Sequence, residues 1–162
     1  MNDSVNIRPR LQSRQSVIIY APLKKVWAIS QDLSRIADYH PRVSRVELIS
    51  GKQFREAGVS YQCHLADGKN NCVEKDIAII PMEKIVTVFT SDTMGLTKLL
   101  PDYMVETIFK EIDSQSTGVE IAHYYSGSNW KVRLLNFVIR RKIARETMEM
   151  LVSAKKMIEN ET

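Results

Sequence analysis

The sequence lacks most of the features that assign a chain to a specialised protein class. It has two cysteines in 162 residues, too few for a disulfide-rich scaffold. A hydrophobic fraction of 44% and a charged fraction of 26% exclude intrinsic disorder and collagen-like repeats. The longest nearly apolar run, Leu134 to Ile139, is far too short to span a bilayer. With no basic region followed by an apolar stretch at its start, the chain is expected to be cytoplasmic.

Common catalytic and metal-binding motifs are also absent. There is no Gly-rich phosphate loop, Gly-x-Ser-x-Gly, His-Glu-x-x-His or Cys-x-x-Cys, which counts against the common enzyme mechanisms. We therefore expect no cofactor. His64, Cys63 and Cys72 are three candidate ligands without a fourth, so we expect no metal site.

The two cysteines flank an Asp67-Gly68 turn signal. A two-residue hairpin there would place Cys63 opposite Cys72, but the apolar positions of the two strands would then fall on opposite faces of the sheet. We expect a longer or bulged loop instead, and two separate buried thiols.

Positive charge is concentrated in one part of the chain. Residues 1–128 are neutral, whereas residues 129–160 carry eight basic and three acidic side chains. A basic cluster, Arg140, Arg141, Lys142 and Arg145, lies in a predicted helix, with no nucleic-acid-binding motif and no excess of basic residues on other elements. We expect no nucleic acid partner. The cluster is either a solvated helix surface or a contact for an anionic membrane.

Hydrophobic periodicity predicts one domain over residues 11–162 after a loose arm over residues 1–10. A strand is predicted over residues 12–20, followed by a helix from Leu23 and a second short helix capped by Asp32. Further strands are predicted over residues 43–49, 59–66, 72–80, 84–90, 103–112 and 119–126. From Asn129 to about Glu159 there is no Gly or Pro, and apolar residues recur at helical spacing. This helix would be about 45 Å long, so the sheet must wrap around it.

Residues 17–27, with the sequence VIIYAPLKKVW, resemble the opening strand, Ala-Pro turn and Val-Trp helix of the START-related superfamily. This superfamily includes the birch-pollen-allergen fold, polyketide cyclase/dehydrase proteins and lipid-transfer domains. Asp32-Leu33, Tyr39-His40-Pro41 and residues 43–46 resemble its second helix and next strand. The resemblance implies an α+β helix-grip fold, with a curved antiparallel β-sheet wrapped around a long C-terminal α-helix and two short helices after the first strand.

The same resemblance implies a cavity for an apolar small molecule between sheet and helix. A bent sheet and a straight helix also touch well only along part of their lengths, which leaves room for a ligand. The expected function is to bind a small hydrophobic molecule (a lipid, isoprenoid quinone or polyketide-like compound) as a carrier or binding protein. A cyclase/dehydrase-type enzyme using the same cavity is the alternative, and an adaptor for a protein or membrane partner is a third class.

Two polar residues are the catalytic candidates, His123 and Glu106. His123 and Tyr125 share a strand face with Val119 and Ile121, so we expect both to reach the cavity. One histidine without a partner acid is not a catalytic set, which favours a buried histidine bonded to a neighbour. Glu106 either lines the pocket, paired with Lys110 on the same strand face, or is solvated at a sheet edge.

The other expected ligand contacts are aromatic or apolar. Met94 to Leu100 forms an irregular apolar segment that serves as a cavity lid or packs on the core. The large aromatic residues are expected near the seam between helix and sheet, where core packing explains them equally well. The complete ligand-binding set is Tyr39, Phe89, Met94, Leu96, Leu100, Glu106, His123, Tyr125, Trp130 and Phe137.

Overall fold

The computed structural model describes residues 9–127 and 129–161, and over these residues it forms one seven-stranded antiparallel sheet and a long C-terminal helix. Of the arm expected over residues 1–10, residues 1–8 lie outside the described residues. The strands are β1 (Leu11–Ile19), β2 (Val43–Glu47), β3 (Ser60–Leu65), β4 (Asn71–Ile80), β5 (Lys84–Asp92), β6 (Met104–Asp113) and β7 (Ser116–Tyr124). The helical segments are α1 (Leu23–Gln31), η1 (Leu33–Arg35), α2 (Ile36–Tyr39), α3 (Leu96–Leu99) and α4 (Trp130–Asn160).

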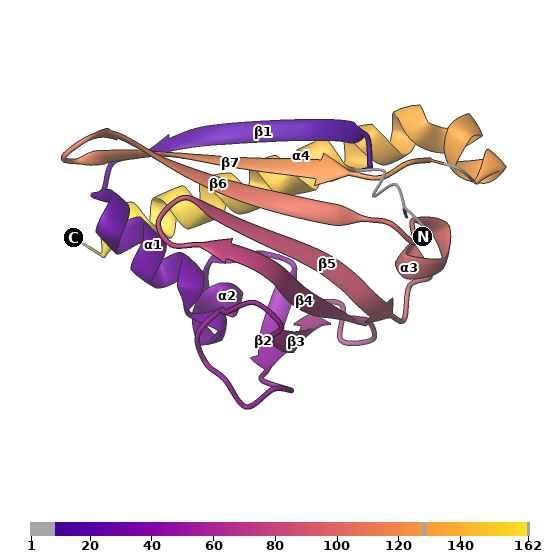
Figure 1. Ribbon diagram of the computed structural model, residues 1–162, viewed down its shortest axis with the longest axis horizontal. Helices are drawn as coiled ribbons and strands as arrows, with labels where there is room; N and C mark the ends of the chain where they lie inside the picture. The colour runs from indigo at the N-terminus through magenta and orange to yellow at the C-terminus, as the bar shows by residue number, and fades with distance from the viewer. Residues whose placement is uncertain (1–8, 128, 162) are drawn as a thin grey trace, which may run out of the picture.

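The sheet has the strand order β1-β7-β6-β5-β4-β3-β2, so the first strand pairs with the last one. Helix α4 runs along the sheet, and α1 and α2 lie near its C-terminal end (Figure 1). The predicted helix-grip fold is confirmed, including the short helices after β1. The segment over residues 91–101, expected to be irregular, begins with the end of β5 and contains the one-turn helix α3.

The ends of the helices follow the local sequence. The side chain of Asn129 accepts a hydrogen bond from the backbone N–H of Lys131 and caps α4, as predicted. Asp32 accepts one from Ser34 and caps η1. Pro22 precedes the first turn of α1, where a missing N–H costs nothing. Two polar caps and a proline before α1 thus set where these helices begin.

The main core lies where the C-terminal half of α4 meets β1, β6, β7 and α1. Leu151 and Ile158 of α4 are buried there, and Trp27 packs edge-on against Phe109 with 5.2 Å between ring centroids. Among the described residues no helix has the length and apolar character needed to cross a bilayer. Buried apolar contacts thus hold the C-terminal half of α4 against the sheet and α1.

The register of β3 and β4 corrects one prediction. Cys63 lies directly opposite Cys72, so the two buried thiols are neighbours and not separate. The loop is longer than two residues, but it adds one residue on each side of Asp67-Gly68 and therefore keeps the register of the short turn. The apolar pattern was misleading because the inward face of β4 is polar.

Candidate functional site

A cavity of about 530 Å³ lies between the concave face of the sheet and α4. Inward-facing residues of β3 to β7 form one wall, and residues of α1, α2, α3 and α4 form the others. Most of the lining is aliphatic or aromatic, as Val105, Phe109, Ile121, Ile143 and Leu151 exemplify. A volume of this size, with an apolar lining and a few polar groups, is typical of sites for small molecules.

Six of the expected ligand-binding residues line this cavity. They are Tyr39, Phe89, Met94, Leu96, Leu100 and His123. The structure brings them together from α2, β5, the α3 segment and β7.

The segment around α3 is fixed in place by Asp92. The Asp92 carboxylate accepts hydrogen bonds from the backbone N–H groups of Met94, Leu96 and Thr97. Partial burial disfavours the charged form, but these bonds and the Thr97 hydroxyl outweigh it and lower the pKa of Asp92 to about 2. Gly95 has φ 83°, a left-handed conformation that favours glycine. The segment therefore forms a wall of the cavity anchored to the end of β5.

His123 has both ring nitrogens engaged by protein hydroxyls. The Tyr103 hydroxyl lies 2.7 Å from Nδ1, and the Thr147 hydroxyl lies 2.8 Å from Nε2. A neutral imidazole donates through one nitrogen and accepts through the other, so one hydroxyl donates to the ring and the other accepts from it. The side chain is 7% exposed, and burial lowers the pKa of His123 to about 4. His123 is therefore neutral at pH 7 and ties β7 to α4.

Glu106 does not face the cavity, contrary to the expected pocket position. Its neighbours Val105 and Thr107 line the cavity, so the Glu106 side chain points to the opposite face of the sheet. It is not solvated at an edge either, since β6 is an inner strand and Glu106 is 5% exposed. The Tyr124 hydroxyl donates to it at 3.1 Å, and Lys84 Nζ lies 3.8 Å away.

Three other expected ligand contacts lie outside the cavity. Tyr125 is fully buried beside Leu100 and Val132, and its hydroxyl donates to Asn136 at 2.6 Å. Trp130 and Phe137 are 68% and 74% exposed, so they are not at the seam between helix and sheet. The reason is that the first turns of α4 lie at the outer end of the molecule, where the sheet does not cover them on all sides (Figure 1).

The basic cluster of α4 is divided among different surroundings. Arg140 donates to the backbone oxygen of Gln12 at 2.7 Å, which ties α4 to β1. Lys142 lines the cavity and lies 3.9 Å from Glu146. Arg141 and Arg145 are exposed on the outer side of α4.

A polar cluster that the sequence analysis missed forms the β3–β4 side of the cavity. Arg55 donates from Nη1 to the Tyr61 hydroxyl and to Asp76 Oδ1, each at 2.8 Å. Tyr61 in turn donates to Glu74 Oε2 at 2.9 Å, and Thr87 donates to Asp76 Oδ1 at 2.8 Å. Of these residues, Arg55, Tyr61, Glu74 and Thr87 line the cavity, and Asp76 is fully buried behind them.

Burial determines the electrostatics of this cluster. It raises the pKa of Asp76 and of Glu74, and the positive charge of Arg55 opposes both shifts. One guanidinium thus faces two carboxyl groups. Asp76 Oδ2 is buried without a hydrogen-bond partner among the described residues. Such an arrangement costs stability, as is common where a protein holds polar groups ready for a ligand.

The turn signal contains the information that would have located the cluster. With the register of the Asp67-Gly68 turn, Tyr61 lies opposite Glu74, and Cys72, Glu74 and Asp76 share the inward face. In that register the apolar positions of the two strands fall on opposite faces of the sheet, so the apolar pattern alone favours a different loop. The polar inward face is itself the sign of a site.

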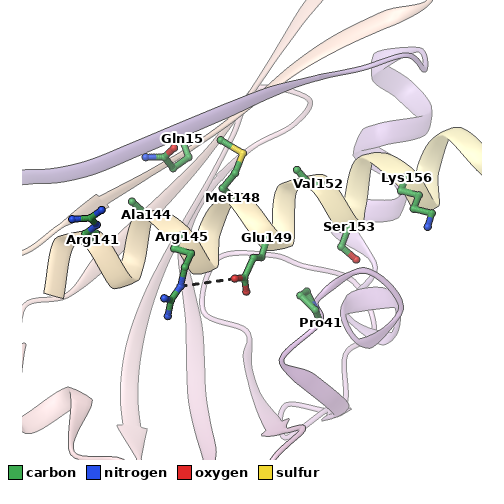
Figure 2. A pocket seen from close by; sticks show the side chains of 10 residues that line it. All are labelled: Gln15, Pro41, Arg141, Ala144, Arg145, Met148, Glu149, Val152, Ser153 and Lys156. Atoms are coloured by element: carbon green, nitrogen blue, oxygen red, sulfur yellow. Dashed lines mark ion pairs between the residues drawn. The ribbon is translucent and has the colours of Figure 1, made fainter. Parts of the chain in front are cut away.

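A second hollow, of about 850 Å³, lies on the outer side of α4 and is open to solvent. Figure 2 shows Met148 and Val152 between the basic side chains of this helix, with Gln15 on one side and Pro41 on the other. Arg145 forms an ion pair with Glu149 within it, at 3.9 Å. Because a single helix forms most of its lining, it encloses a small molecule less well than the inner cavity does.

His64 belongs to the surface and not to this site. It lies 3.1 Å from Glu47 and 3.4 Å from Arg45 on the neighbouring strand. Over residues 9–127 and 129–161, no group of three or more His, Cys, Asp and Glu side chains is placed to hold a metal ion.

Solved structures of START-like proteins have the same fold as this chain. The Zhui aromatase/cyclase of Streptomyces sp. R1128 superposes with a TM-score of 0.69 at 14% identity, covering 90% of this chain and 92% of that one. A START superfamily protein of Mycobacterium smegmatis has a TM-score of 0.69 at 13% identity, with coverages of 92% and 97%. No protein-family model matches the sequence, and no curated protein matches it. The structural similarity establishes the START-like helix-grip fold and not the function.

Proposed function

We propose that this protein binds a small hydrophobic molecule in the cavity between sheet and α4, as a carrier or binding protein. The observation that carries this proposal is the cavity itself, which is largely apolar on the α4 side and polar on the β3–β4 side. A lipid, isoprenoid quinone or polyketide-like compound has a matching apolar body. Its burial would supply most of the affinity, and a few polar groups would orient it.

An enzyme of the polyketide cyclase/dehydrase kind is the second candidate. The similarity to an aromatase/cyclase favours it. Against it, both nitrogens of His123 are bonded to protein hydroxyls, and Glu106 lies on the other face of the sheet. A general acid or base needs a free position toward its substrate. A carrier or binding protein is therefore better supported than an enzyme.

Contact with an anionic membrane is part of the carrier proposal. The segment from Trp130 to Arg145 has six basic and no acidic residues. Five large apolar side chains in its first turns are 52–74% exposed: Trp130, Leu134, Leu135, Phe137 and Val138. Exposed apolar residues flanked by basic ones are typical of helices that lie in the membrane interface. The cytoplasmic face of a membrane, which is anionic, suits the proposed cytoplasmic location.

Native mass spectrometry of the purified protein tests the proposed function. We expect a species heavier by the mass of one small molecule, and release of that molecule under denaturing conditions. Substitution of Val105, which lines the cavity, by tryptophan should remove the additional mass. The same species in the Val105→Trp variant would show that the molecule binds elsewhere.

A further inference from the structure

Building on the proposed function, we propose that Glu74 recognises the polar end of the ligand, and that this end is a hydrogen-bond donor, namely a hydroxyl or a protonated amine. Carboxylates and phosphates are excluded from this position.

Glu74 presents its accessible surface to the cavity. It shares the inward face of β4 with Cys72 and Asp76, which are both buried. Its own side chain is only half-buried and lines the cavity. The carboxyl group is therefore shielded by protein on most sides and open toward the ligand.

Protein contacts of the Glu74 carboxyl group are hydrogen-bond donors. Tyr61 donates to Oε2 at 2.9 Å, and the Cys72 thiol lies 3.7 Å from Oε1. The direction of the first bond is fixed, because Arg55 donates to the Tyr61 hydroxyl and has no acceptor atom of its own. The single hydroxyl hydrogen of Tyr61 is therefore donated in the hydrogen bond to Glu74. The Cys63 thiol is a third donor to this carboxyl group. A carboxylate has about four acceptor positions, so one is left for a donor on the ligand.

The charges around Glu74 reject an anionic ligand group at this position. Arg55 already forms an ion pair with Asp76 at 2.8 Å, and its one guanidinium also has to compensate Glu74. A ligand carboxylate would add a third negative charge in a buried place. The other basic side chains of the cavity wall are Arg42 and Lys142, which lie 3.5 Å and 3.9 Å from Glu146. They belong to the segment after α2 and to α4, and their ion pairs are with acidic residues of α4, not with Glu74.

Three probes with the same alkyl chain test the proposal: decan-1-ol, decylamine and decanoate. Isothermal titration of the wild-type protein at pH 7.5 should give at least tenfold tighter binding for the alcohol and the amine than for decanoate. Glu74→Gln should weaken decylamine binding at least tenfold and the binding of the alcohol less, since an amide oxygen still accepts a hydrogen bond. Glu83→Gln, in the exposed turn between β4 and β5, should leave all three affinities unchanged.

The ranking in the wild-type protein needs no variant, so the test holds even where Glu74→Gln fails to fold. Decanoate binding as tightly as the alcohol overturns the proposal, and so does an unchanged decylamine affinity in folded Glu74→Gln. Equal affinity for all three probes, lost in Val105→Trp, upholds the cavity and overturns the role of Glu74. No binding of any probe contradicts the proposed function itself.

Discussion

Tyr61 and Glu74 lie directly opposite each other on β3 and β4, and the Tyr61 hydroxyl donates a 2.9 Å hydrogen bond to the Glu74 carboxylate. This pair gives the cavity a polar side. The opposite wall, formed by α4 residues such as Ile143 and Leu151, is largely apolar. A ligand with one polar and one apolar end would bind this cavity in a single orientation.

Arg55 stabilises the polar cluster, so its loss should be costly. We expect Arg55→Gln to lower the free energy of unfolding by about 3 kcal/mol at pH 7.5, because it leaves the buried Asp76 and the half-buried Glu74 carboxyl groups without a cation. The pKa values of Asp76 and Glu74 are raised by burial, so protonation at lower pH removes the unpaired charge. The difference from wild type should therefore shrink between pH 7.5 and pH 5 in urea titrations. A difference that is constant with pH would contradict this account.

His123 should make the stability of the protein depend on pH. Burial lowers its pKa to about 4 in the folded state, against about 6.5 in an unfolded chain, so the unfolded state binds more protons between these values. Its contribution is fully present above pH 6.5 and is lost as the pH falls toward 4. Between pH 7.5 and pH 5 the wild-type protein should lose about 2 kcal/mol from this residue.

Replacement of His123 isolates this contribution from those of other groups. His123→Gln keeps a polar side chain between Tyr103 and Thr147 but does not titrate. Urea titrations at both pH values should show a loss in the variant that is smaller by about 2 kcal/mol than in wild type. Equal losses in the two proteins would mean that His123 is not buried as described. The comparison also subtracts His40, whose pKa burial likewise lowers to about 4.

A bulky side chain inside the cavity should block binding without unfolding the protein. Val105 lines the cavity from β6, whereas Val88 on the adjacent strand β5 points to the other face of the sheet. We expect Val105→Trp to weaken decan-1-ol binding at least tenfold, and Val88→Trp to leave it nearly unchanged. Circular dichroism checks that both variants fold. Equal effects of the two substitutions would place the binding site elsewhere.

The exposed start of α4 should bind anionic membranes. We expect co-sedimentation with vesicles of 70% phosphatidylcholine and 30% phosphatidylglycerol, and little with phosphatidylcholine alone. Leu134→Ser combined with Phe137→Ser should reduce vesicle binding at least fivefold, because these side chains would enter the membrane interface. Both are 74% exposed, so their replacement should change the stability of the fold little. Ile112→Ser, at an exposed apolar position on β6, is the matched control. Binding that does not depend on phosphatidylglycerol would contradict the role of the basic residues.

The sequence predicts the architecture well because its strongest signals are local. The Ala21-Pro22 turn, the Asn129 cap and a long stretch without Gly or Pro define the elements on which the helix-grip fold is built. The face of the sheet on which an individual residue lies is less predictable where both faces of a strand carry apolar and polar residues. On β6, Thr107 faces the cavity and Ile108 faces away, so alternation alone did not place Glu106.

Two further differences have physical reasons that no periodicity reveals. Trp130 and Phe137 belong to the exposed start of α4, so their apolar character serves no core. Glu74 and Asp76 face inward because Arg55, more than 15 residues away in the sequence, compensates them. Pattern analysis assumes that apolar residues face the interior, and it fails where a protein builds a polar site inside.

Methyl NMR with decan-1-ol tests the central claim, that the cavity holds a small apolar molecule, most directly. Ile121 lines the cavity, whereas Ile112 is exposed on β6, and the δ1 methyl signal of each reports on its surroundings. We predict a saturable shift of the Ile121 signal as the alcohol is added, no shift for Ile112, and loss of the Ile121 response in Val105→Trp. An Ile121 signal that stays unchanged up to the solubility limit of the alcohol would contradict the account.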